Sequence, residues 1–77
     1  MLNGQRVLET LAALEHEQWM SWAKAIAPSL DIEEADAIMP RWNRLWVPYD
    51  KLPEEEKEKD RTWARRVLQI LNREMGR

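Results

Sequence analysis

The chain has 77 residues, five of them tryptophan, with 12 basic against 14 acidic side chains and a formal net charge of −2. The absence of cysteine excludes disulfides and thiolate chemistry, and no run approaches the roughly 20 apolar residues of a membrane span. The first residues lack the pattern of a signal peptide, so we expect one small soluble domain, residues 1–77, in the cytoplasm.

The first predicted element is a helix over about residues 5–27, which Pro28 would end. Glu15 projects near the middle of its apolar face and Gln18 lies inside that face. His16 falls at the margin, where we interpret it as a hydrogen-bond donor. At about 100° per residue, the apolar side chains on this face are Val7, Leu8, Leu11, Leu14, Trp19, Trp22 and Ile26.

A short second helix is predicted to begin at Asp31. Asp31 and Glu34 have the spacing of a capping box, in which two side chains satisfy the first backbone N–H groups of a helix. Pro40 is expected to interrupt this helix because it lacks an N–H and clashes with the preceding turn. Alternatively, Pro40 starts a third short helix, on which Trp42 and Trp46 would share a face.

Residues 47–52 are predicted to form an extended connector. Pro48 and Pro53 flank it, and each disfavours helical backbone in the residue that precedes it. Tyr49 and Leu52 are the side chains that we expect to anchor this connector to the rest of the molecule.

The last helix is predicted over about residues 54–75 and stops at Gly76. Lys57 and Asp60 fall on the same stripe as its apolar side chains, which are Trp63, Ala64, Val67, Leu68, Ile70, Leu71 and Met75. The expected fold is therefore all-α. It is a compact bundle of two long helices with one or two short helices and the Pro-containing connector.

The charged residues on the inward faces are the best candidates for a binding site, since polar groups beside a core are unfavourable unless they pair or bind something. If the long helices pack antiparallel, Glu15 approaches Lys57 and Asp60. One interpretation is a structural network of ion pairs. The other is a pocket in which Lys57 and Arg61 contact an anion, Glu15 and Asp60 orient it, and the walls are aromatic. These walls would be Trp19, Trp46 and Tyr49.

The sequence does not indicate an enzyme, a metal site or a cofactor. One histidine and no cysteine cannot build the usual zinc shells, and no catalytic triad, glycine-rich phosphate loop or paired-carboxylate motif is recognisable. Arg41 and Arg44 beside Trp42 and Trp46 fit base stacking with phosphate contacts. The acidic balance of the whole chain nevertheless disfavours a nucleic-acid partner.

Two blocks of the chain resemble the RyR domain, the repeat named after ryanodine receptors and also found alone in bacteria and phages. The first is Glu15-His16-x-x-Trp19. The second runs Val47-Pro48-Tyr49, then Leu52-Pro53, Glu56-Lys57 and Asp60-Arg61. The likeness covers roughly residues 8–71. Residues 28–46 depart from the family pattern, which indicates a shortened version of the size often encoded by phages.

The resemblance implies a non-catalytic module, because RyR-like domains in prokaryotes accompany proteins suspected of sensing nucleotide-derived signals in antiviral defence. A free-standing copy would be a sensor or a sponge for such a signal. The expected function is thus the binding of an anionic, nucleotide-like molecule. The alternative is a protein-interaction or self-assembly module, forming a homo-oligomer without a small ligand. The candidate ligand-binding residues are Glu15, His16, Trp19, Trp46, Tyr49, Lys57, Asp60 and Arg61.

Overall fold

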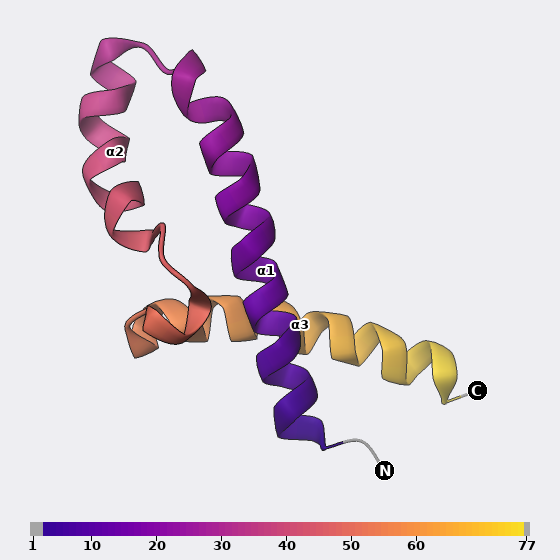
Figure 1. The fold of residues 1–77 in the computed structure, drawn as a ribbon. Helices are drawn as coiled ribbons and strands as arrows, with labels where there is room; N and C mark the ends of the chain where they lie inside the picture. Colours follow the sequence, from indigo (N-terminus) through magenta and orange to yellow (C-terminus); the bar gives the residue numbers. More distant parts are fainter. Residues whose placement is uncertain (1–2, 77) are drawn as a thin grey trace.

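The computed structural model describes residues 3–76 as three α-helices and two short 3-10 helices. In chain order these are α1 (Gly4–Ile26), η1 (Ala27–Ser29), α2 (Ile32–Leu45), η2 (Tyr49–Lys51) and α3 (Glu54–Met75). Figure 1 shows α2 returning beside α1, while α3 crosses the N-terminal half of α1 at a steep angle. No strand occurs in the described range. The predicted all-α architecture, with two long helices packed together and a shorter middle helix, is confirmed.

The ends of the helices follow the capping signals of the sequence. Asp31 Oδ1 accepts a hydrogen bond from the Glu34 N–H at 2.8 Å, and Glu34 Oε1 accepts one from the Asp31 N–H at 3.0 Å. This confirms the predicted capping box. α3 stops at Gly76, where a Cβ would lie 2.8 Å from the carbonyl oxygen of Asn72. A residue without a side chain therefore fits that end of the helix.

Pro40 lies inside α2, which continues without a break from Ile32 to Leu45. The predicted interruption, and the alternative of a third helix starting at Pro40, are both wrong. A proline removes one helical hydrogen bond, but the turns beyond it are held by tertiary packing. The ring centroid of Trp42 lies 5.8 Å from that of Trp19 and 5.9 Å from that of Trp22, both on α1.

The contact between α1 and α3 is built on small side chains. Ala12 on α1 and Ala64 on α3 are fully buried, and His16 is 3% exposed. The distance between packed helices depends on the size of the side chains at their contact, so alanines at the crossing let the two backbones approach. His16 therefore lies at the centre of the buried stripe of α1 rather than at its margin as predicted.

Several large apolar side chains predicted to be buried face outward. Leu14 is 47% exposed, Trp22 is 54% exposed and Trp63 is 55% exposed. Gln18 is also exposed, so the prediction that it lies inside the apolar face is wrong. The buried face of α1 follows its alanines and His16. It is therefore rotated away from the face that carries the large apolar side chains.

The connector carries a short 3-10 turn at Tyr49–Lys51 between extended residues. Leu52 is 5% exposed and anchors the connector, as predicted, and Tyr49 is half-buried. Over residues 3–76, no helix combines the length and the apolarity needed to cross a bilayer.

The molecule is more open than a single compact domain. Its radius of gyration is 15.3 Å and it extends 50 Å along its longest axis, whereas a compact domain of this length has a radius of about 11.5 Å. No large side chain among the described residues is fully buried. Figure 1 shows the C-terminal half of α3 continuing past α1 without a neighbouring helix.

Candidate functional site

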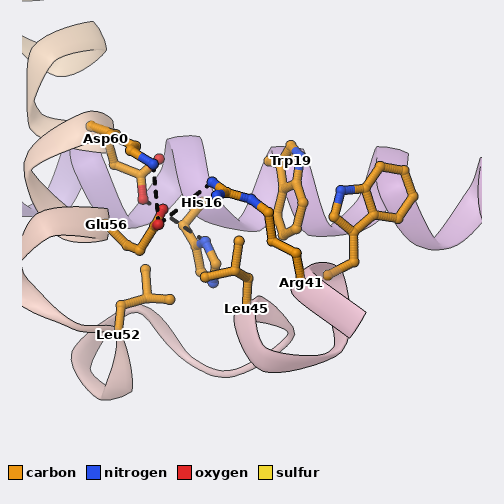
Figure 2. A pocket seen from close by; sticks show the side chains of 9 residues that line it. His16, Trp19, Arg41, Leu45, Leu52, Glu56 and Asp60 are labelled. Carbon is orange, nitrogen blue, oxygen red and sulfur yellow. Dashed lines mark hydrogen bonds and ion pairs between the residues drawn. The ribbon is translucent and has the colours of Figure 1, made fainter. Parts of the chain in front are cut away.

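A half-open pocket of about 200 Å³ lies where the three helices meet (Figure 2). His16 and Trp19 enter it from α1, Arg41 and Trp42 from α2, and Asp60 from α3. The remaining lining residues are Leu45, Leu52, Glu56 and Lys59. The site thus combines aromatic and aliphatic walls with charged groups from two helices.

The aromatic side chains of the pocket pack against one another. Trp19 and Trp42 meet edge to face, with their ring planes at 89°, an arrangement that indole pairs favour. The His16 ring stacks on Trp19 with centroids 5.9 Å apart and planes at 22°. Trp42 also contacts Trp46, with centroids 6.2 Å apart. A flat ligand ring would therefore meet walls that are already in place.

His16 ties α1 to the connector. Its Nε2 lies 2.7 Å from the carbonyl oxygen of Val47, and since a carbonyl only accepts, this nitrogen carries the hydrogen. The predicted role of His16 as a hydrogen-bond donor is confirmed. The other ring nitrogen, Nδ1, faces Asp60 Oδ2 at 3.8 Å. That distance is too long for a hydrogen bond.

Asp60 is the least satisfied charged group of the pocket. Its side chain is 18% exposed, and its one close polar neighbour is the His16 ring; no hydrogen-bond donor within residues 3–76 reaches its carboxylate. Burial raises the pKa of Asp60, the carboxylates of Glu15 and Glu56 raise it further, and His16 opposes them. A half-buried carboxylate without donors is unfavourable for the folded state and is ready to accept hydrogen bonds from a ligand.

The rim of the pocket carries an excess of positive charge. Arg41 lies 3.5 Å and Lys59 3.1 Å from the same oxygen of Glu56. Their side chains are 55% and 59% exposed. One carboxylate neutralises one of the two cations, so the second charge is available to an anion at the mouth.

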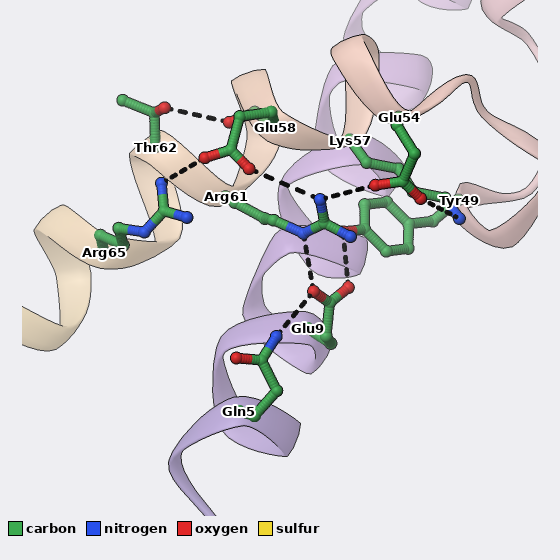
Figure 3. Close-up of polar contacts among 9 residues, drawn as sticks. All are labelled: Gln5, Glu9, Tyr49, Glu54, Lys57, Glu58, Arg61, Thr62 and Arg65. Atoms are coloured by element: carbon green, nitrogen blue, oxygen red, sulfur yellow. Dashed lines mark hydrogen bonds and ion pairs between the residues drawn. The ribbon is translucent and has the colours of Figure 1, made fainter.

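A second polar cluster fastens α1, the connector and α3 outside the pocket (Figure 3). Arg61 Nε donates to Glu9 Oε1 at 2.6 Å, and Arg61 Nη1 donates to Glu54 Oε2 at 3.0 Å. The Tyr49 hydroxyl donates to Glu9 Oε2 at 2.7 Å. The bonds from Arg61 and Tyr49 lower the pKa of Glu9. Burial, together with the bond to Glu9, raises the pKa of Tyr49 to about 12.

Lys57 belongs to this second cluster as well. Its Nζ lies 3.5 Å from Glu54 Oε1 and 5.7 Å from the centre of the Tyr49 ring. Lys57 and Arg61 are therefore already paired with carboxylates, and neither lines the pocket. The structure offers Arg41 and Lys59 as the cations nearest to a bound molecule.

The eight residues predicted as a site separate into groups. His16, Trp19 and Asp60 come together in the pocket. Glu15 is half-buried, near enough to Asp60 to raise its pKa. Tyr49, Lys57 and Arg61 lie in the second cluster, and Trp46 lines a separate, more open hollow together with Tyr49.

Several polar and aromatic residues of these two clusters were not among the site residues predicted from the sequence. For Arg41 and Trp42, the sequence did carry a signal, since an arginine beside a tryptophan fits base stacking with a phosphate contact. Glu56 and Lys59 resemble ordinary solvated positions on a charged helix. Glu9 gave no signal at all, because Arg61, its partner, lies 52 residues further along the chain.

The described residues contain no group of three or more His, Asp or Glu side chains that could hold a metal ion. What the pocket offers chemically is an aromatic slot with a carboxylate acceptor inside and a cationic rim. This combination suits recognition of a flat ring that has N–H donors and an anionic substituent.

Comparison with known proteins leaves the family of the chain open. No family model matches the sequence, and the searches of curated proteins and of solved structures gave no significant match. The resemblance to RyR domains therefore stays a prediction.

Proposed function

We propose that this chain is a non-catalytic binding module whose pocket takes a nucleotide-like molecule, with the base inside and the phosphate at the rim. The observation that carries the proposal is the Asp60 carboxylate, which lines the same pocket as Trp19 and Trp42 and receives no hydrogen bond from the described residues. In the setting that the resemblance to RyR domains suggests, such a module would sense or sequester a nucleotide-derived signal exchanged between a phage and its host.

The Asp60 carboxylate, as a hydrogen-bond acceptor, favours guanine over the other bases. The Watson–Crick edge of guanine has two adjacent N–H donors, which match the two oxygens of an ionised carboxylate such as that of Asp60. Adenine and cytosine place a ring acceptor beside their amino group, and a carboxylate oxygen would be repelled by it. A site built around hydrogen bonds to a ligand discriminates strongly against analogues that leave its polar groups unpaired.

The tryptophans and the two cations of the pocket also suit a nucleotide. Stacking of a base on an aromatic side chain is worth about 1–3 kcal/mol, and Trp42 and Trp19 supply indole surfaces in the pocket. A volume of about 200 Å³ suits a single base rather than a whole nucleotide. The phosphate would then stay at the mouth, where Arg41 and Lys59 share one carboxylate.

The test is a titration of the protein with guanosine monophosphate, adenosine monophosphate, guanosine and a panel of cyclic dinucleotides, followed by tryptophan fluorescence and melting temperature. We expect guanosine monophosphate to bind more tightly than adenosine monophosphate, because of Asp60, and more tightly than uncharged guanosine, because of the rim. Binding should weaken as salt is raised.

Matched variants separate the pocket from general surface charge. Arg41→Ala should weaken binding of guanosine monophosphate about tenfold, whereas Arg44→Ala, on the same helix but outside the pocket, should leave it unchanged. A flat response to the whole panel would contradict the proposal. Equal losses from the two arginine variants would contradict the assignment of the rim.

A further inference from the structure

The C-terminal half of α3 exposes an apolar stripe between basic side chains. Leu71 and Met75 continue the stripe of the buried Ala64 but are 45% and 80% exposed, and Ile70 is 50% exposed. The exposed Arg66 and Arg73 lie on the same part of the helix. In Figure 1 this half of α3 projects beyond α1. We call residues 66–75 the basic end of the molecule.

The start of α2 has the opposite charge and the same exposure of apolar surface. Ile32 is 81% exposed, and a shallow hollow runs along residues 30–33. The charged residues from 31 to 36 are all acidic and exposed; they are Asp31, Glu33, Glu34 and Asp36. We call residues 30–36 the acidic end of the molecule.

The two ends cannot meet within one copy. The molecule extends 50 Å along its longest axis, and Figure 1 shows the start of α2 and the end of α3 at opposite extremes. Each end has an exposed apolar side chain beside charged ones. The acidic end has four carboxylates and no basic side chain, and the basic end has Arg66 and Arg73 against the single carboxylate of Glu74. A second copy of this chain is therefore a partner whose charge matches at both ends.

We infer that two copies of this chain form a symmetric dimer in which the basic end of each copy docks on the acidic end of the other. A two-fold axis makes the same contact twice and closes the assembly. Ile70, Leu71 and Met75 of one copy would cover Ile32 and the hollow of the other. The arrangement also gives the open molecule a second source of buried apolar surface.

The experiment measures the mass of the full chain by multi-angle light scattering and sedimentation over a range of concentrations. One variant, R66E/R73E, makes both ends acidic. Another, E33K/E34Q/D36K, leaves Asp31 as the single carboxylate of residues 30–36 and makes both ends net basic, while glutamine at position 34 can still complete the capping box. We expect each variant alone to be monomeric, with the dissociation constant raised about tenfold or more. An equimolar mixture of the two should recover the dimer, because opposite charges then meet at both contacts.

The control is Glu17→Lys with Arg44→Glu, two exposed positions away from both ends, which should leave the dimer intact. Circular dichroism checks that every variant keeps its helices. A wild-type chain that stays monomeric up to millimolar concentration overturns the inference, as do reversed variants that still dimerise alone. Masses that grow beyond two copies overturn the closed dimer, since the same ends joined head to tail would make filaments.

Discussion

Asp60 illustrates how a single charged residue can oppose folding. Its carboxylate lies near the His16 ring and the carboxylates of Glu15 and Glu56. In the folded chain the ionised form loses water without gaining a donor, which is why its pKa is raised. A ligand that donates hydrogen bonds to this carboxylate would supply the missing partners. Asp60 would therefore stabilise such a complex more than it stabilises the free protein.

The first prediction concerns the substitution Asp60→Asn. Because the pKa of Asp60 is raised on folding, its contribution to stability falls as the pH rises from the unfolded value, near 4, through the folded pKa. Removing the charge should therefore leave the free energy of unfolding at pH 7 unchanged or raise it by about 1 kcal/mol.

The same variant should lose affinity for guanosine monophosphate, since the neutral amide cannot accept two N–H bonds from the base. Urea unfolding at pH 7 and pH 4, together with the ligand titration, measures both effects. A clear loss of stability at pH 7 would indicate that Asp60 is a structural residue, paired chiefly with His16.

Part of the site could be predicted from the sequence because helical periodicity alone places residues on a face. Lys57 and Asp60 fall on the inward stripe of α3, and both are only 18% exposed. The partners of these residues could not be predicted, because pairing depends on how the helices cross. Glu9 and Arg61 show this most clearly, as nothing local connects them.

At the scale of elements, helix boundaries followed from capping and breaking signals that act over three or four residues. Asp31 with Glu34, and Gly76 at the end of α3, set boundaries where the sequence predicted them. Pro40 was the exception. Its local effect is unfavourable, but Trp42, two residues later, packs on Trp19 and Trp22 and holds the helix together.

The second prediction is that Pro40→Ala stabilises the protein. Alanine restores the missing backbone N–H inside α2 and removes the clash with the preceding turn. Proline in a helix interior costs about 3 kcal/mol relative to alanine. We expect a gain of about 1–2 kcal/mol in urea unfolding. Ala37→Pro is the reverse control and should destabilise. A loss of stability in Pro40→Ala would show that the proline fits its place in α2.

The shape of the whole molecule could not be predicted from hydrophobic patterning. The sequence predicted a bundle in which the long helices meet along their large apolar side chains, whereas α3 crosses α1 at Ala12 and Ala64. Ala64 lies on the predicted apolar stripe of α3, but Ala12 carries little hydrophobic weight and is outranked on α1 by the larger apolar side chains. The small size of the two alanines, however, decides where two helices can come close. Trp22, Trp63 and the end of α3 are left on the surface as a consequence.

The third prediction follows from this exposed surface. If apolar side chains are covered by a second copy, the folded state is stabilised by association and its melting temperature depends on protein concentration. We expect the melting temperature to rise by several degrees between micromolar and millimolar chain. High salt should flatten that rise, because it screens the charges at both ends. A melting temperature independent of concentration would contradict self-association.

The row of indoles also has a spectroscopic consequence. Trp19 and Trp22 each lie within 6 Å of Trp42, measured between ring centroids, and Trp46 lies 6.2 Å from it. Chromophores so close share their excited states. Light absorbed by any of the four would migrate along the row before emission, and their near-ultraviolet dichroism would be an exciton signal of the group. Trp42 contacts each of the other three tryptophans. A change in the position of Trp42 would therefore alter the fluorescence and the near-ultraviolet dichroism of all four.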